Sequence, residues 1–62
     1  MSVKRRELVR HLEKNGYILF REGARHSIFY KGDIMVPLKR RTQIDNITAN
    51  RICRQAEIDE IF

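Results

Sequence analysis

Apolar residues recur at helical spacing near both ends of the chain. Leu8, Val9 and Leu12 share one face of a predicted helix over residues 3–15, which Ser2 caps and Gly16 stops. A second set follows the spacing i, i+3, i+4 and i+7 and predicts another amphipathic helix; its members are Ala49, Ile52, Cys53 and Ala56. The candidate N-caps of this second helix are Asp45, Asn46 and Thr48.

Three short segments between the helices have the composition of strands. Residues 17–21 are aromatic and aliphatic and run into a glycine turn, and residues 26–31 resume the pattern. Gly32-Asp33 fits a type II′ hairpin turn, after which residues 34–36 return along the sheet. Pro37 lacks a ladder donor and predicts the end of that strand.

The polar and basic residues 38–46 are predicted to form a loop before the second helix. Side chains alternate along a strand, so Ile28 and Tyr30 lie on one face of the middle strand and Ser27 and Phe29 on the other. The element order is α-β-β-β-α. This order predicts an α+β fold with a three-stranded antiparallel sheet that two helices cover on one face, as in double-stranded-RNA-binding domains.

Length restricts this organisation to a single domain over residues 1–62, and a chain this short buries roughly 60% of its unfolded surface. The single Cys53 excludes a disulfide framework, and neither histidine has a cysteine partner at ligand spacing, so we expect no metal site and no cofactor. We find no signal-peptide pattern and no long apolar run. We therefore expect a cytoplasmic protein that does not enter membranes.

The formal charge of +5 is unevenly distributed. Residues 1–54 carry all 13 bases and five acids, a formal charge of +8, and three acids make the remainder acidic. The bases expected to bind phosphates fall in three clusters: Lys4, Arg5, Arg6 and Arg10; Lys39, Arg40 and Arg41; and Arg51 with Arg54. A surface this cationic favours a polyanionic partner, with nucleic acid first.

His26 is the residue on which catalysis would depend. A glycine turn at Gly23 delivers it to the start of a strand, with Arg25 beside it. Cleavage of RNA without metal needs a base for the 2′-hydroxyl proton, and an imidazole with an ordinary pKa near 6.5 suits that task. The residues alone leave two interpretations open, since such a histidine also packs in hairpins and bonds a carbonyl.

The run Gly23-Ala24-Arg25-His26-Ser27-Ile28-Phe29 resembles the HicA family of bacterial messenger-RNA interferase toxins. The flanking elements agree in order and spacing: residues 8–17 before the run, Val36-Pro37 after it, and residues 48–56 in the second helix. The resemblance covers nearly the whole chain.

This resemblance implies a toxin of a toxin–antitoxin system that acts as a metal-independent endoribonuclease in the stress response. It implies that His26 is catalytic and that Gly23 shapes its loop. Arg25, Ser27 and Lys39 are then the nearest candidates for RNA binding and charge stabilisation. The implied partners are the messenger-RNA substrate and a HicB-type antitoxin, with which the chain would form a hetero-oligomer.

The sequence departs from the family pattern at three points. Ala24 replaces the usual serine, so Ser27 is a candidate for the missing hydroxyl. Glu57 replaces the glycine that commonly ends the second helix, which favours a helix running on toward Phe62. No second histidine follows Val36-Pro37, so a separate acid would have to come from Lys39, water or His26 itself.

Two other functions remain as alternatives. The chain could be a non-catalytic module that grips duplex RNA by shape, or a partner-binding domain that meets an acidic protein. His11 and Cys53 have structural interpretations, because each accompanies the apolar stripe of its helix. The strand aromatics could stack on bases but are expected in the core; they are Tyr17, Phe20, Phe29 and Tyr30.

Overall fold

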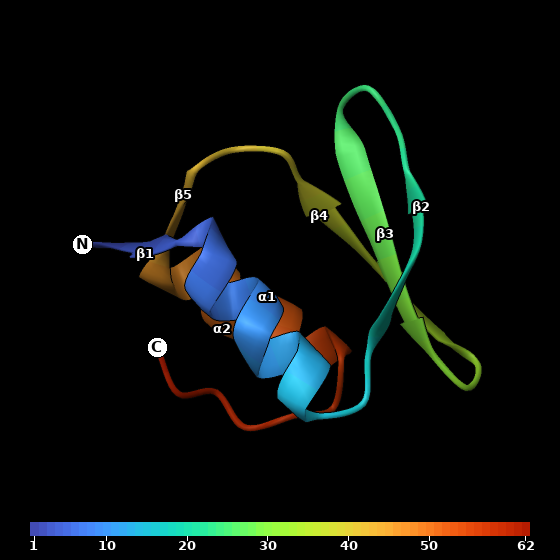
Figure 1. The fold of residues 1–62 in the computed structure, drawn as a ribbon. Coiled ribbons are helices and arrows are strands. Elements are labelled where there is room, and N and C mark those ends of the chain that lie inside the picture. Colours follow the sequence, from blue (N-terminus) through green and yellow to red (C-terminus); the bar gives the residue numbers. More distant parts are fainter.

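The computed structural model describes all 62 residues and contains two helices and two sheets (Figure 1). The helices are α1 (Arg5–Lys14) and α2 (Asn46–Gln55). The three-stranded antiparallel sheet has the order β2-β3-β4, and a two-stranded antiparallel sheet pairs β1 with β5. The strands are β1 (Ser2–Lys4), β2 (Ile18–Glu22), β3 (His26–Lys31), β4 (Ile34–Lys39) and β5 (Gln43–Asp45). The predicted α+β class is confirmed, and so is the three-stranded antiparallel sheet, which follows α1 and precedes α2 along the chain.

The hairpin of β3 and β4 has the predicted two-residue turn, because Lys31 pairs with Ile34 across Gly32-Asp33. Gly32 has a φ of 58°, which the first position of a II′ turn requires. Pro37, however, does not end the strand as predicted, because β4 continues to Lys39. β4 is an edge strand, where the missing N–H of proline does not break a ladder. The extension places Lys39 directly opposite His26.

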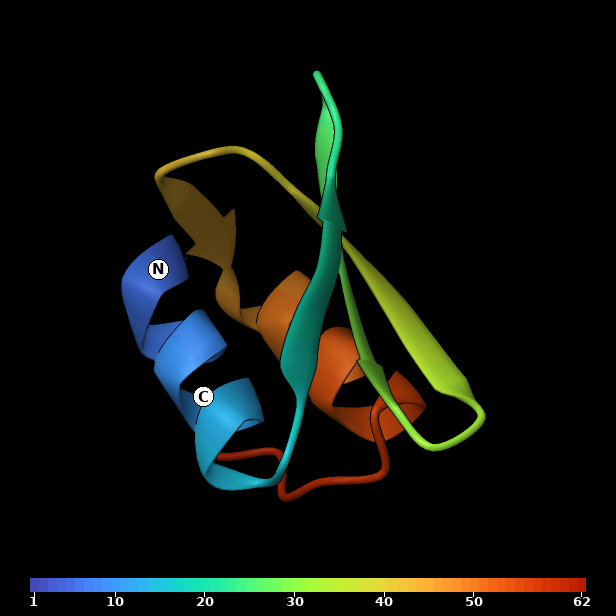
Figure 2. The same cartoon turned by 45° about the vertical axis from the view of Figure 1, so that its right-hand side comes forward.

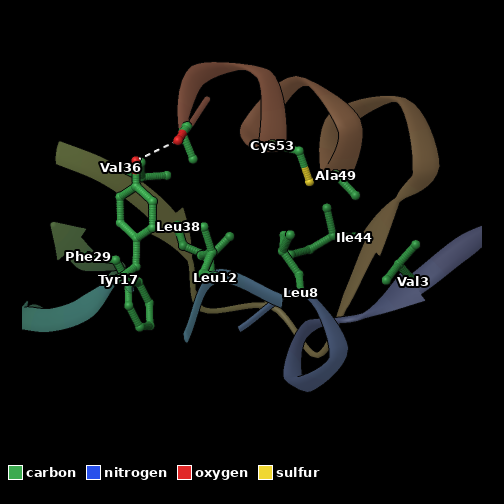
Figure 3. Packing of buried hydrophobic residues seen from close by; sticks show 11 residues of the cluster. Val3, Leu8, Leu12, Tyr17, Phe29, Val36, Leu38, Ile44, Ala49 and Cys53 are labelled. Atoms are coloured by element: carbon green, nitrogen blue, oxygen red, sulfur yellow. Dashed lines mark hydrogen bonds between the residues drawn. The ribbon is translucent and has the colours of Figure 1, made fainter. Parts of the chain in front are cut away.

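Both helices cover one face of the three-stranded sheet (Figure 2). The sheet contributes Phe29, Val36 and Leu38 to the core, and the helices contribute residues including Leu8 and Leu12 (Figure 3). Ser27 and Phe29 are buried on this inner face, as the predicted alternation requires. Hydrophobic burial between the layers is the main stabilising term in so small a fold.

The two-stranded sheet was not predicted from the sequence. Ser2 belongs to β1 rather than capping α1, whose N-cap is Lys4, and the predicted loop over residues 38–46 contains the end of β4 and all of β5. Val3 pairs with Ile44, and both side chains are buried. This pairing brings the start of α1 against the segment after β4.

The two helices end in the same way, on residues of different type. After α1, Gly16 has a φ of 92°, and the N–H of Tyr17 reaches back to the Leu12 carbonyl at 3.1 Å. After α2, Glu57 has a φ of 57°, and the N–H of Ile58 reaches the Cys53 carbonyl at 2.9 Å. Both are Schellman motifs. The expected continuation of α2 toward Phe62 is therefore wrong, because Glu57 adopts the left-handed conformation that glycine usually supplies.

The aromatic side chains divide between the two faces of the sheet. Tyr17 is buried, and its hydroxyl donates to the Ala56 carbonyl at 2.7 Å (Figure 3). Phe29 is also buried, but Phe20 is 57% exposed and Tyr30 is half-buried on the opposite face. The expectation that all four aromatics belong to the core is wrong for Phe20 and Tyr30. Neither helix is long and apolar enough to cross a membrane.

Candidate active site

His26 begins β3 at the end of a tight turn. The N–H of Gly23 donates to the His26 carbonyl at 2.8 Å, and a Cβ at Gly23 would lie 3.3 Å from that oxygen. Any larger residue at position 23 would therefore crowd the turn that positions the histidine. Arg40 holds the same turn from the other strand: its N–H reaches the Arg25 carbonyl at 3.2 Å and its guanidinium the Gly23 carbonyl at 3.1 Å.

The imidazole of His26 is exposed and lines a cleft of about 370 Å³ between the sheet and the start of α2. Lys39, paired opposite His26, and Arg41 supply cations to this cleft. The remaining polar lining comes from Gln43, Asp45 and Thr48. A single exposed histidine thus shares a cleft with two cations and several hydrogen-bonding groups.

Asp45 is the only carboxylate that lines this cleft, and its side chain caps the N-terminus of α2. Its Oδ1 accepts from the N–H of Ile47 at 3.0 Å, and its Oδ2 accepts from Thr48. The hydrogen bond from the Thr48 side chain, followed by that from Ile47, lowers the pKa of the Asp45 carboxyl. The group is ionised at neutral pH and cannot serve as a proton donor.

A second and larger cleft of about 730 Å³ lies between α1 and the segment after β4. It combines two basic clusters that are far apart in the sequence: Lys4, Arg5, Arg6 and Arg10 from one side, and Arg40 and Arg41 from the other. The pairing of β1 with β5 brings these clusters together. We call this surface the basic cleft. It meets the His26 cleft at Arg41 and Gln43, which line both.

Ser27 does not lie on the binding surface expected from the sequence. Its side chain is fully buried on the inner face of β3, so the expectation that it contacts RNA or replaces the family serine is wrong. Its Oγ accepts from the Arg5 guanidinium at 2.8 Å and donates to Glu22 at 3.2 Å. Arg5 also donates to the Lys39 carbonyl at 3.1 Å. Ser27 and Arg5 therefore tie α1 to the two strands that carry His26 and Lys39.

The other predicted RNA contacts do not all gather at the site. Arg25 is exposed in the turn before His26. Arg51 and Arg54, expected to act as a pair, line neither cleft. Arg54 donates two 3.2 Å hydrogen bonds to the carboxylate of Glu60, so its guanidinium is paired with an acid near the end of the chain.

The remaining histidine and the cysteine have the structural roles expected of them. The His11 ring is 2.7 Å from the Asp59 carbonyl and packs edge-on against Phe62. Cys53 is fully buried, and burial raises the pKa of its thiol, which opposes nucleophilic reactivity. No group of three histidine, cysteine or acidic side chains is arranged like a metal-binding site.

Sequence reasoning missed the polar lining that the two-stranded sheet supplies. Gln43, on β5, lines both clefts, and Thr42, directly before β5, lines the basic cleft. The signal was faint: each strand of this sheet places one apolar residue between two polar ones, as in Ser2-Val3-Lys4. Such a three-residue alternation is too short to distinguish from a loop.

Comparison with known proteins gives one family match. A sequence model of the family described as "HicA toxin of bacterial toxin-antitoxin" matches residues 5–58. The match includes the whole of α1, β2, β3, β4, β5 and α2. No curated protein and no solved structure matches the chain.

Proposed function

The chain belongs to the HicA family of toxins from bacterial toxin–antitoxin systems, and from that premise we propose that it is an endoribonuclease that cleaves messenger RNA with His26. The observation that supports this most strongly is the position of the exposed imidazole. His26 is held by a hydrogen-bonded turn in a cleft with Lys39 and Arg41. The family membership also implies an antitoxin partner, and we propose that this partner is of the HicB type and forms a hetero-oligomer with the toxin.

The proposed chemistry follows from the groups that the cleft contains. His26 removes the proton of the 2′-hydroxyl, the resulting oxygen attacks the adjacent phosphorus, and the 5′-oxygen departs as a hydroxyl with a proton from water, Lys39 or the protonated His26. Lys39, on the neighbouring strand opposite His26, offsets the charge that develops on the phosphorane. This route needs no metal ion and leaves a 2′,3′-cyclic phosphate on one product.

The basic cleft supports RNA as the substrate. Its cations line a continuous surface that reaches the His26 cleft through Arg41, so a strand with its reacting phosphate at His26 could place neighbouring phosphates along α1. We propose that Lys4, Arg6 and Arg41 contact the RNA backbone and that Arg5 and Arg40 mainly hold the site together. The helix and sheet arrangement also supports a fold like that of double-stranded-RNA-binding domains.

The test is cleavage of a single-stranded messenger RNA by the purified toxin in the presence of EDTA. We expect His26→Ala to slow cleavage by about 100-fold or more, because a positioned general base contributes that much. An RNA with a 2′-deoxy nucleotide before the cleaved bond should resist the parent enzyme. Thermal unfolding of the variant should match that of the parent, since the His26 ring is exposed.

His11→Ala is the matched control, because it removes the other imidazole of the chain. It should lower stability by releasing the end of the chain, yet leave the cleavage rate of the folded protein within about threefold. Equal cleavage by His26→Ala and the parent would refute the catalytic role. Tight RNA binding without cleavage by the parent would instead identify a non-catalytic RNA-binding module.

A further inference from the structure

The outer face of the three-stranded sheet, opposite the helices, is largely apolar. On β3, His26 is followed on this face by Ile28 and Tyr30. The neighbouring strands add residues in register with them, and the complete set of apolar residues is Ile18, Phe20, Ile28, Tyr30, Met35 and Pro37. We call this set the apolar face. Figures 1 and 2 show no other element of the chain on this side of the sheet.

Several members of the apolar face are unusually exposed for large hydrophobic side chains. Ile18 is 59% exposed, Phe20 57% and Met35 48%. Contiguous apolar patches on a soluble protein mark interaction sites more often than isolated exposed residues do. Leu19 on β2 pairs with the inner-face residue Phe29 and is also 45% exposed. The remaining exposed large side chains, such as Ile47 on α2, lie outside this sheet.

The strand geometry joins the apolar face to His26. Residues two apart on a strand are about 7 Å apart and point the same way, so Ile28 lies directly beside the histidine. Lys39, opposite His26, closes the same end of the face, and Arg21 lies opposite Ile28. None of the strand residues on this face is acidic. A molecule seated on the apolar face would meet His26 at a cationic edge.

The chemistry of the face favours a protein over RNA or a second copy of the chain. Four of its six apolar residues have no aromatic ring, and the two rings, Phe20 and Tyr30, pack edge-on with centroids 5.5 Å apart and do not form a flat pair. A second copy carries the same formal charge of +5, and its strand residues on this face offer no carboxylate to the cations at the edge. A partner with an apolar centre and carboxylates at its rim complements the face in both respects.

We propose that the antitoxin of this toxin binds the apolar face and thereby covers His26. The inference rests on the family assignment, which implies an antitoxin, and it extends the proposed function by locating the inhibitor. It does not require His26 to be catalytic, so the two proposals can fail separately. Apolar contacts would supply most of the affinity, and acidic residues of the antitoxin would reach His26, Lys39 and Arg21.

The experiment measures the affinity of the toxin for the antitoxin, taken as the protein encoded by the open reading frame adjacent to its gene. We expect Phe20→Asp with Met35→Asp to weaken binding by about 100-fold or more, because central apolar residues dominate interface energies. Ile47→Asp with Ile61→Asp is the matched control, since it adds the same two charges at exposed apolar residues outside the sheet and should change affinity less than about threefold.

RNA cleavage and oligomeric state separate the remaining outcomes. The double variant should cleave RNA at the parent rate and unfold at nearly the parent temperature, because both side chains are exposed. Unchanged antitoxin affinity in a folded double variant would overturn the proposal. So would a double variant that binds RNA weakly but the antitoxin normally, or a free toxin whose dimer the double substitution dissociates.

Discussion

The basic cleft and the apolar face differ in almost every physical property, yet the first opens into the His26 cleft and the second lies beside His26. The basic cleft has one hydrophobic residue among the eleven that line it, and its six cations come from two separate segments. The apolar face is built from a single sheet and has cations only toward one end. Under the two proposals, RNA binds near His26 through electrostatic contacts, whereas the antitoxin covers the same histidine through apolar contacts.

This difference has a consequence for regulation. Electrostatic contacts to phosphates weaken as salt rises, whereas burial of apolar surface does not. An inhibitor that competed for the basic cleft would have to displace RNA from its strongest contacts. An inhibitor on the apolar face needs only to cover His26, and its affinity can be set without changing the affinity of the toxin for RNA.

We expect the largest difference between the two surfaces when charges in the basic cleft are reversed and the affinity for RNA is measured. Arg6→Glu with Arg41→Glu should weaken RNA binding on the order of 100-fold at low salt, because each residue is expected to contact a phosphate. The same pair should change antitoxin affinity less than about fivefold if the antitoxin rests on apolar contacts. Fluorescence anisotropy on a His26→Ala background measures RNA binding without cleavage.

Lys14→Glu with Lys31→Glu controls for net charge, because these two lysines are exposed and line neither cleft. If this control weakens RNA binding as much as the cleft variant, then RNA senses only the overall charge of the protein. The basic cleft would then have no special part in recognition.

The sequence predicted the helices and the hairpin well because their signals extend over many residues. The stripe of Leu8 and Leu12 spans about one turn, and that from Ala49 to Ala56 spans about two turns. A glycine first in a two-residue hairpin turn predicts a positive φ, and Gly32 has a φ of 58°. Asp45, one of three candidate caps, is the one that accepts bonds from the first turn of α2.

The sequence could not predict how the two clefts form, because their shape depends on contacts distant along the chain. β1 and β5 are three residues each, and pairing with one another defines them more than local preference does. The face on which Phe20 lies depends on an irregularity in the pairing of β2 between Leu19 and Arg21. A one-residue change in strand pairing reverses the direction of a side chain, and no local pattern reveals it.

We expect an effect of intermediate size at Ser27, which separates the stabilising role of the inner face of β3 from the proposed catalytic role of its outer face. Ser27→Ala should lower the free energy of unfolding by about 1 to 2 kcal/mol, because it removes a buried hydroxyl that Arg5 and Glu22 both contact. Its neighbour His26 faces the other way, so His26→Ala should affect cleavage but not stability. Urea denaturation and a cleavage assay at 25 °C measure the two effects.

Ser27→Thr is a useful companion because it keeps the hydroxyl while adding a methyl group to a fully buried position. Normal stability in Ser27→Ala would show that the hydrogen bonds to Arg5 and Glu22 contribute little. Loss of cleavage in a stable Ser27→Ala protein would show instead that the hydrogen bonds of Ser27 to Arg5 and Glu22 position His26 and do not stabilise the fold.

The smallest expected effect concerns stability alone and touches neither surface. Glu57 holds a φ of 57° after α2, where Gly16 serves after α1, and a side chain in that conformation carries a steric cost that glycine lacks. Glu57→Gly should therefore raise the free energy of unfolding by about 0.5 to 1 kcal/mol. Gly16→Ala should lower it by a similar amount, which urea denaturation of both variants would measure.

Because residue 57 lines neither cleft and lies off the sheet, the affinities of Glu57→Gly for RNA and for the antitoxin should stay at parent values. A change in either affinity would mean that the measured affinities report stability, and that the contrast between the two surfaces must be tested again in the stabilised background.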